Sequence, residues 1–234
     1  MSFYNYGSSD QQSLDVYVSQ VMRQVFTKMF LAMVITALSA YMVLSIPELA
    51  TFIFTKPMVY WGLLIGEIVM VIALSAALNK LSNIGATLLF YAYSILNGLT
   101  LSCIVLVYTS ASIVMTFAIT AGVFATMAIY GYVTKNDLTK FGSFMTMALF
   151  GLIICIVVNM FMHSSTMEWI ISFAGVVIFI GLTAWDVQKI KRMAMMTDYN
   201  NASKLATIGA LSLYLDFVNL FLYLLRFFGN SRDS

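Results

Sequence analysis

The last hydrophobic run of the chain, residues 210–228, carries polar groups that could do chemistry inside a membrane. Its sequence is ALSLYLDFVNLFLYLLRFF, with Asp216 near the middle and Arg226 near the end. On a helix the strongly polar side chains of this run fall within an arc of roughly 80°: they are Ser212, Asp216, Asn219, Tyr223 and Arg226. An ionisable group deep in hydrocarbon costs at least ~2.5–3.5 kcal/mol, so Asp216 should face protein or water. The stripe fits either polar contacts between helices or a proton or cation site.

Glu67 and Asp186 are the other acidic residues within predicted membrane helices. Two buried carboxylates that lie close together cannot both ionise at low cost, so such a pair shares one proton. A pair of this kind senses pH, and when both groups are ionised it can bind a hard divalent cation such as calcium. Alternatively, each carboxylate is satisfied separately by Asn, Tyr, Ser or basic partners. The spacing along the chain leaves both interpretations open.

The composition defines the class of protein. Of the 234 residues 61% are hydrophobic and only 9% are charged, and the mean hydropathy is +0.91. Soluble domains carry about 25% charged residues, so this chain is predicted to be an all-α integral membrane protein whose partner is the lipid bilayer. The net charge of +2 includes no basic run and no aromatic-interleaved basic patch, so we expect no nucleic-acid partner.

Seven hydrophobic runs approach the ~20 residues that a bilayer requires, and they predict seven transmembrane helices. We place these helices at about 26–46, 58–78, 86–108, 111–132, 143–162, 168–188 and 205–228. Pro47 and Pro57 bracket the predicted first loop, because proline interrupts helices. Tyr108 opens a tight turn between the third and fourth helices.

The domain organisation follows from the same pattern. Residues 1–22 are polar and lack the features of a signal peptide, so we predict a cytoplasmic tail, disordered up to about Tyr17 and helical beyond it. Residues 23–230 should form a single seven-helix domain, because no linker or shift in composition divides them. Residues 231–234 form a short C-terminal tail.

The distribution of basic residues predicts the orientation. Of 12 lysine and arginine residues, all but Lys56, Arg226 and Arg232 fall on the side of the N-terminal tail when the chain crosses seven times. Cytoplasmic loops are enriched in such residues, which predicts a multi-pass protein of the inner cell membrane with its N-terminus in the cytoplasm and its C-terminus outside. A re-entrant last helix, with both termini inside, stays the alternative.

Several kinds of site are absent from the sequence. Cys103 and Cys155 lie in apolar runs and are interpreted as small buried side chains, and His163, the single histidine, is expected in a loop or interface. A zinc centre built from His and Cys ligands cannot be assembled from these residues. The Gly-x-Gly-Asp signature of aspartyl intramembrane proteases is absent before Asp186 and Asp216. We therefore expect neither enzymatic activity nor a cofactor.

Five segments resemble the bacterial members of the Bax inhibitor motif family of seven-helix membrane proteins. They are LSLYLDFVNLFLYLLRFFG at 211–229, AWDVQKI at 184–190, TKNDLTKFGSFMTMALFGL at 134–152, ILNGLTLS at 95–102 and IGE at 65–67. The resemblance covers nearly all of the chain after residue 20. It implies a fold in which the last helix is central and surrounded by the other six, and a pH-sensitive calcium leak.

The resemblance also implies roles for individual residues. The family's two aspartates, which form a hydrogen-bonded proton sensor, match Asp186 and Asp216, and we expect these two to bind calcium when ionised. A second family contact, between a glutamate and an arginine, matches Glu67 and Arg226. Asn219, on the face of Asp216, is predicted as a supporting polar contact.

One position departs from the family pattern. The family's bacterial members place an arginine that latches the first aspartate eleven residues after the glutamate, and Leu78 occupies that position here. Lys80, two residues further on, could replace the latch with a single ammonium, although it lacks the planar fork of arginine.

Two functions follow from these observations. The first is a pH-sensitive calcium leak or transport protein, gated by protonation of the buried aspartate pair between the sixth and seventh helices. The alternative is a regulator without transport activity that binds another membrane protein, such as a membrane-bound protease, in a stress response. The polar tail at 1–22 would then be the first candidate for a contact with that partner.

Overall fold

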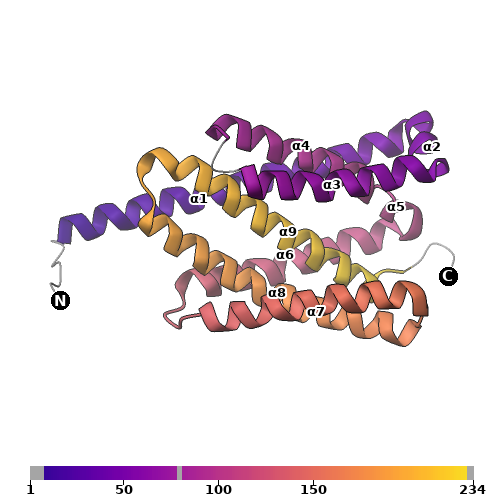
Figure 1. Ribbon diagram of the computed structural model, residues 1–234. Helices are drawn as coiled ribbons and strands as arrows, with labels where there is room; N and C mark the ends of the chain where they lie inside the picture. The colour runs from indigo at the N-terminus through magenta and orange to yellow at the C-terminus, as the bar shows by residue number, and fades with distance from the viewer. Residues whose placement is uncertain (1–7, 78–80, 231–234) are drawn as a thin grey trace.

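The computed structural model describes residues 8–77 and 81–230, and its regular elements in this part of the chain are all helical (Figure 1). The helices are α1 (Ser8–Ser45), α2 (Pro47–Thr55), α3 (Pro57–Ala77), α4 (Asn83–Leu101), α5 (Ile104–Val107), α6 (Ser110–Val133), α7 (Thr139–Met162), α8 (Ser165–Met196) and α9 (Ala202–Phe228), with a 3-10 turn at Tyr199–Asn201. Seven segments in these ranges are long and apolar enough to cross a membrane, which confirms the predicted fold class. The predictions for Leu78, Lys80 and the tail at 231–234 lie outside the described residues.

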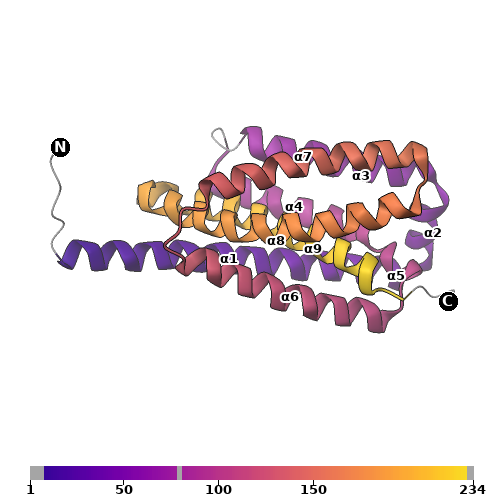
Figure 2. The same ribbon diagram turned by 90° about the horizontal axis from the view of Figure 1, so that it is seen from below.

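The last helix, α9, is the centre of the bundle. In the membrane-spanning stretch of α9, 72% of the residues are buried inside the protein. The corresponding share is 6% for α3 and 17% for α7. Helix α9 packs against α1, α4, α6 and α8, while α3 lies against α4 and α7 against α8. Figure 1 shows α9 running between a group formed by α1, α3 and α4 and a group formed by α6, α7 and α8, and in the view from below α9 lies behind α8 (Figure 2).

The chain crosses the bundle an odd number of times. The first turns of α1, the α6–α7 loop and the α8–α9 turn lie at one end, called here the α8–α9 end, and the last turn of α9 lies at the opposite end (Figure 1). The two ends of the described chain therefore lie at opposite ends of the bundle. The seven-span prediction requires this arrangement, whereas a re-entrant last helix would return the C-terminus to the end where α1 begins.

Helix α1 begins earlier than predicted. The tail was expected to be disordered up to about Tyr17, but α1 is continuous from Ser8. The Tyr17 hydroxyl donates a hydrogen bond to the carbonyl of Thr197 (2.9 Å), and Val18, Val21 and Met22 are buried in the core. These apolar residues recur at helical spacing, so they extend the packed face of α1 across the predicted boundary at residue 22.

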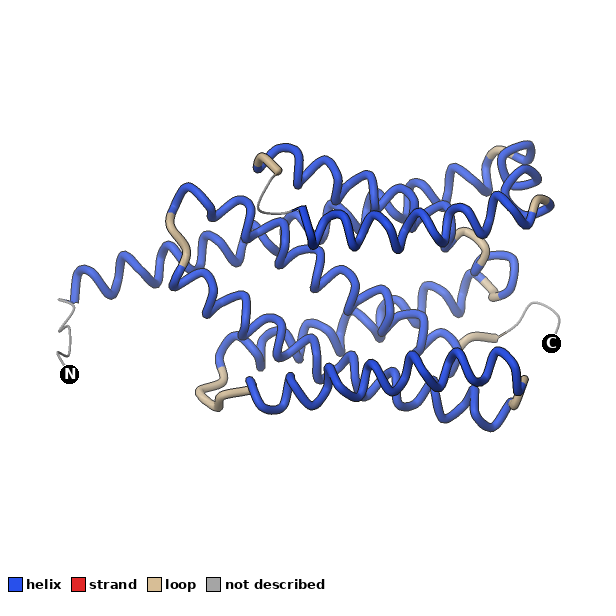
Figure 3. Tube along the Cα trace, viewed as in Figure 1, coloured by secondary structure: helices blue, strands red, loops and turns tan. Residues whose placement is uncertain are grey.

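Two predicted connections differ in detail (Figure 3). The predicted loop between Pro47 and Pro57 is the short helix α2, and each proline opens a helix, because the first helical position needs no backbone N–H donor. The third span is interrupted after Leu101, before α5. The tight turn that follows Tyr108 is confirmed, with the Thr109 hydroxyl capping α6 by accepting from Ser112 N–H.

Close helix approaches depend on glycine at two places. A Cβ atom at Gly98 of α4 would collide with the backbone carbonyl of Thr36 in α1. A Cβ atom at Gly131 of α6 would collide with the backbone carbonyl of Ala184 in α8. The first contact lets α4 approach α1 closely, and the second holds α6 against the part of α8 that carries Asp186.

Candidate functional site

Asp216 faces protein, as the polar stripe predicts. Its side chain is only 5% exposed, and one of its oxygen atoms, Oδ2, is buried without a hydrogen-bond partner in the described part of the chain. The same face of α9 packs against α8, where Tyr223 stacks on Phe179 with ring centroids 5.9 Å apart. Asn219 donates its side-chain hydrogen bond to the carbonyl of Leu215 in its own helix (2.8 Å), so its amide serves α9 itself.

Asp186 reaches the level of Asp216 because α8 is longer than expected. The sequence placed Asp186 within about one turn of the end of its helix, but α8 continues for ten residues beyond it, to Met196. Asp186 therefore lies about 15 Å from the α8–α9 end, and Asp216, fourteen residues into α9 after Ala202, lies about 21 Å from it. The two antiparallel helices thus bring the two acids to similar depths.

The two acids interact through their charges. Asp186 acts electrostatically on Asp216, and Lys189 acts on both. The Lys189 ammonium lies 4.6 Å from the centre of the Trp185 ring. Within residues 8–77 and 81–230 no hydrogen bond joins the two carboxyl groups, so the shared proton stays a prediction. The described part of the chain thus contains a buried acid with one unpartnered oxygen, Asp216 Oδ2, and a second acid on the neighbouring helix.

A calcium ion at this pair would find few protein ligands. Among the described residues, no group of three or more His, Cys, Asp or Glu side chains could hold a metal ion. Tight calcium sites use six to eight oxygen atoms, so Asp186 and Asp216 would hold the ion only weakly and leave most of its shell to water and backbone carbonyls. Their role as calcium ligands stays a prediction.

The α6–α7 loop is fastened to α8 close to Asp186, a contact that we call the loop clamp. It joins residues 132–139 to residues 188–192. The buried Gln188 amide uses both of its ends: its Oε1 accepts from the backbone N–H of Leu138 (2.9 Å), and its Nε2 donates to the carbonyl of Asn136 (2.8 Å). A single side chain thus fixes the backbone of the loop two residues from Asp186.

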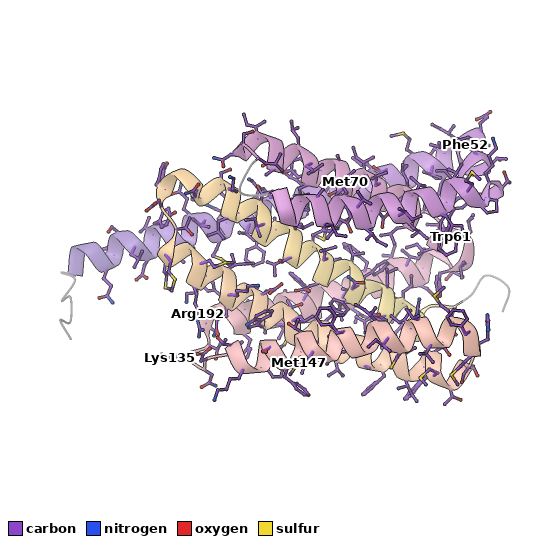
Figure 4. The ribbon with its side chains drawn as sticks, viewed as in Figure 1. Phe52, Trp61, Met70, Lys135, Met147 and Arg192 are labelled. Atoms are coloured by element: carbon purple, nitrogen blue, oxygen red, sulfur yellow. The ribbon has the colours of Figure 1, made fainter. Side chains whose placement is uncertain are left out.

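Charged residues complete the loop clamp. Lys191 donates to the backbone carbonyl of Tyr132 (2.8 Å), and Arg192 forms an ion pair with Asp137 (2.8 Å). The hydroxyl and backbone N–H of Thr139 donate to the Asp137 carboxylate, and together with Arg192 they lower its pKa to about 2. Figure 4 shows Arg192 pointing toward the loop that precedes α7.

The sequence prediction missed the loop clamp. The segment TKNDLTK at 134–140 was recognised only as part of a family resemblance. An aspartate followed two residues later by threonine is a frequent turn signal, because the aspartate accepts from the backbone N–H ahead of it. That signal could have predicted the turn, but the sequence contains nothing that would pair it with Gln188.

The predicted contact between Glu67 and Arg226 is not formed. Glu67 Oε2 accepts instead from the amide of Asn97 (3.3 Å), and Asn97 Oδ1 accepts from the hydroxyl of Tyr214 (2.9 Å). Tyr214 precedes Arg226 by twelve residues, or roughly 18 Å along α9, so this network lies far from the end where Arg226 is exposed. The Arg226 guanidinium lies 5.8 Å from the centre of the Tyr223 ring.

The fold and these buried acids define a polytopic helical membrane protein with ionisable groups in its interior. A family model described as inhibitor of apoptosis-promoting Bax1 matches residues 18–233, and the chain therefore belongs to that family. The resemblance inferred from the sequence motifs is confirmed.

The relatives match the chain over nearly its whole length. The chain is 45% identical to the inner membrane protein YbhL of Escherichia coli K12 over 214 residues, which cover 90% of this chain and 92% of the relative. It is 46% identical to an uncharacterized protein of Borreliella burgdorferi over 218 residues, with 92% and 94% covered. It is 40% identical to the uncharacterized protein RP147 of Rickettsia prowazekii over 233 residues, with 97% and 96% covered.

Proposed function

We propose that this protein is a multi-pass protein of the bacterial inner membrane that lets calcium cross in a pH-dependent way, controlled by the aspartate pair of α8 and α9. The observation that carries the proposal is Asp216 of α9, a buried acid with one oxygen that has no hydrogen-bond partner among the described residues, and that feels the charge of Asp186 on α8. Intramembrane acids of this kind are typical of ion and proton pathways. The similarity to YbhL supports the inner-membrane location.

The basic residues of the loop clamp support an orientation for the bundle. Lys189, Lys191 and Arg192 all lie in the last turns of α8, near the α8–α9 end. Because basic residues are enriched on the cytoplasmic side, this end and the start of α1 are proposed to face the cytoplasm, and the end of α9 the outside.

The charge of the aspartate pair sets the proposed mechanism. With one shared proton, Asp186 and Asp216 attract each other and hold α8 against α9. When the pH rises and the proton leaves, two like charges repel each other in a low-dielectric interior, which shifts the equilibrium toward an open arrangement. The two carboxylates then balance the charge of one calcium ion, and their weak hold lets the ion leave again.

Calcium flux into proteoliposomes tests this mechanism. The flux of the wild-type protein should rise as the pH is raised, and Asp216→Asn should remove that rise because the asparagine amide cannot ionise. Glu168→Gln is the matched control, since Glu168 is an exposed acid on α8 near its other end, and it should keep the wild-type profile. A wild-type pH profile in Asp216→Asn would overturn the mechanism.

A regulator that acts only through a protein partner gives a different result in the same assay. In that case neither variant changes the calcium flux, because the flux would not exceed that of empty liposomes. The comparison with empty liposomes therefore separates the two functions that the sequence leaves open.

A further inference from the structure

A second polar cluster lies on the face of α9 opposite to Asp216. Tyr214 precedes Asp216 by two residues, so the two side chains point about 200° apart around the helix. Tyr214 is fully buried among residues of α1 and α4. It belongs to what we call the glutamate network, which consists of Glu67, Asn97, Tyr214 and Thr36 from α3, α4, α9 and α1.

Hydrogen bonds connect the four members in a row. The Asn97 amide donates to Glu67 Oε2 (3.3 Å), and the Tyr214 hydroxyl donates to Asn97 Oδ1 (2.9 Å). The Thr36 hydroxyl donates its proton to the Tyr214 hydroxyl (2.6 Å), because the Tyr214 proton is used in the bond to Asn97. Because Tyr214 fixes which end of the amide faces it, the N–H of Asn97 points toward the glutamate.

The carboxyl group of Glu67 has one open position. Its Oε1 atom is buried and has no hydrogen-bond partner in the described part of the chain. Glu67 lies midway along α3, in the middle of a candidate membrane span. A buried carboxyl oxygen without a protein partner is able to carry a proton or to bind a cation.

The groups that face Glu67 are neutral at physiological pH. The titratable side chains that interact with it electrostatically are Tyr60 on α3, Tyr93 on α4 and Tyr214 on α9, and the Tyr60 hydroxyl lies 3.7 Å from Cys103 Sγ. Among the described residues, no lysine, arginine or histidine acts on Glu67. A single negative charge in this place therefore has no counter-ion within residues 8–77 and 81–230.

We propose that the glutamate network is a second site, separate from the aspartate pair, which binds one positive charge, either a proton or an alkali-metal ion, at Oε1 of Glu67. One carboxylate balances one positive charge, whereas a divalent ion would leave an excess charge in the membrane interior. The Thr100 hydroxyl lies beside this carboxyl group but donates its proton to the carbonyl of Leu96, so its oxygen and the carboxylate are hard ligands that suit a monovalent ion as well as a proton.

Infrared spectroscopy of the purified protein in nanodiscs tests the proposal directly. A protonated carboxyl group gives a C=O stretching band that disappears when the group ionises. In a buffer whose cation is N-methyl-D-glucamine, the wild-type protein should show such a band that titrates with pH. Glu67→Gln should remove it, and Asp216→Asn should retain it, because the two sites are separate. The exposed-acid variant Glu168→Gln should also retain it.

Two further arms identify the ligand. If the site accepts an alkali-metal ion, sodium or potassium chloride shifts the titration of this band to lower pH in the wild type but not in Glu67→Gln. If it accepts only a proton, neither salt shifts the titration. Tyr214→Phe provides an independent check, since losing the hydroxyl that orients Asn97 should move the titration without removing the band.

The proposal fails if the spectra of wild type and Glu67→Gln show the same titrating bands and neither salt has an effect in either protein. It also fails if the Glu67 band is present but does not titrate at any accessible pH, because the glutamate would then be a permanently neutral structural group. Loss of pH-dependent calcium flux in Asp216→Asn bears on the aspartate pair alone, so the two proposals succeed or fail separately.

Discussion

The polar atoms of the loop clamp are hydrogen-bonded, whereas each of two interior acids, Asp216 and Glu67, has a buried oxygen without a hydrogen-bond partner among the described residues. In the loop clamp, both ends of the Gln188 amide are hydrogen-bonded, and Asp137 has Thr139 and Arg192 as partners. In the interior, Asp216 Oδ2 and Glu67 Oε1 are buried without partners in the described part of the chain. Satisfied groups fix helices in place, whereas open acids are free to bind protons or cations. The loop clamp thus stabilises the packing of the helices, whereas Asp216 and Glu67 are the groups that we propose bind protons or cations.

The largest effect on stability should come from Gly131→Ala. The added Cβ would collide with the backbone of Ala184, so α6 must move away from the part of α8 that Gln188 and Asp186 share. Overpacking of this kind costs roughly 1–3 kcal/mol. Gly151→Ala is the matched control, because among the described residues no atom from another helix lies within 4 Å of the added Cβ in α7. Thermal unfolding in detergent should show a clearly lower midpoint for Gly131→Ala only.

The second prediction tests whether the hydrogen bonds of Gln188 in the loop clamp stabilise the fold. Gln188→Leu leaves the N–H of Leu138 and the carbonyl of Asn136 without their partner, at a cost of about 1–3 kcal/mol. Gln188→Glu keeps the acceptor for Leu138 but sets a carboxylate oxygen against the carbonyl of Asn136, so its unfolding midpoint should also lie below that of wild type. Equal midpoints for Gln188→Leu and wild type would mean that the loop clamp does not stabilise the fold.

A smaller loss is expected for Tyr214→Phe, which removes one hydroxyl from the glutamate network. Its hydrogen bonds to Asn97 and Thr36 would be lost, and a typical bond contributes about 0.5–1.5 kcal/mol. Tyr223→Phe is the comparison variant, because its ring stacks on Phe179 and its hydroxyl bonds to none of the residues described. Chemical denaturation should therefore separate the two tyrosines, and similar losses would argue against an organised network.

The smallest effect should come from Asp137→Asn. The ion pair with Arg192 is exposed, with side-chain exposures of 40% for Arg192 and 67% for Asp137, so it contributes little. The pKa of Asp137 is lowered to about 2, so its contribution is fully present above the unfolded value and is lost only as the pH falls toward 2.

The pH dependence of that variant gives a sharp test. Across roughly pH 5 to 8 the carboxylate of Asp137 stays ionised, so the difference in unfolding midpoint between Asp137→Asn and wild type should be constant. A difference that varies with pH in this range would show that the loop clamp titrates together with another group. The contrast between a loop clamp whose stabilisation is independent of pH and interior acids that titrate would then no longer hold.

Local patterns predicted much of this structure. The seven spans follow from hydropathy over about 20 residues, and the protein-facing side of α9 follows from the spacing of Asp216 and Tyr223, because both are properties of a single helix. The errors occurred where a helix end depends on distant contacts. Helix α1 begins at Ser8 because Tyr17 and the residues after it pack against other helices. The C-terminal end of α8 was predicted near residue 188, whereas the helix continues to Met196.

The candidate site was only partly predictable. The sequence identified Asp186, Asp216 and Glu67 as intramembrane acids, and the structure brings the first two to neighbouring helices at similar depths. The partner of Glu67 was predicted wrongly, since Asn97 occupies the place expected for Arg226. A hydrogen bond between side chains that are 30 positions apart depends on how two helices are rotated relative to each other. The hydrophobic pattern of each helix by itself does not determine that rotation.

The sequence by itself determined that the chain must enter a bilayer, that it crosses seven times, and that its few internal charges must avoid lipid. These conclusions rest on the cost of exposing polar groups to hydrocarbon, which acts on each segment separately. Only the tertiary structure decided which polar atoms are paired, as Gln188 is with the α6–α7 loop, and which stay open, as in Asp216 and Glu67. Pairing requires contact within about 3 Å between segments that packing alone brings together.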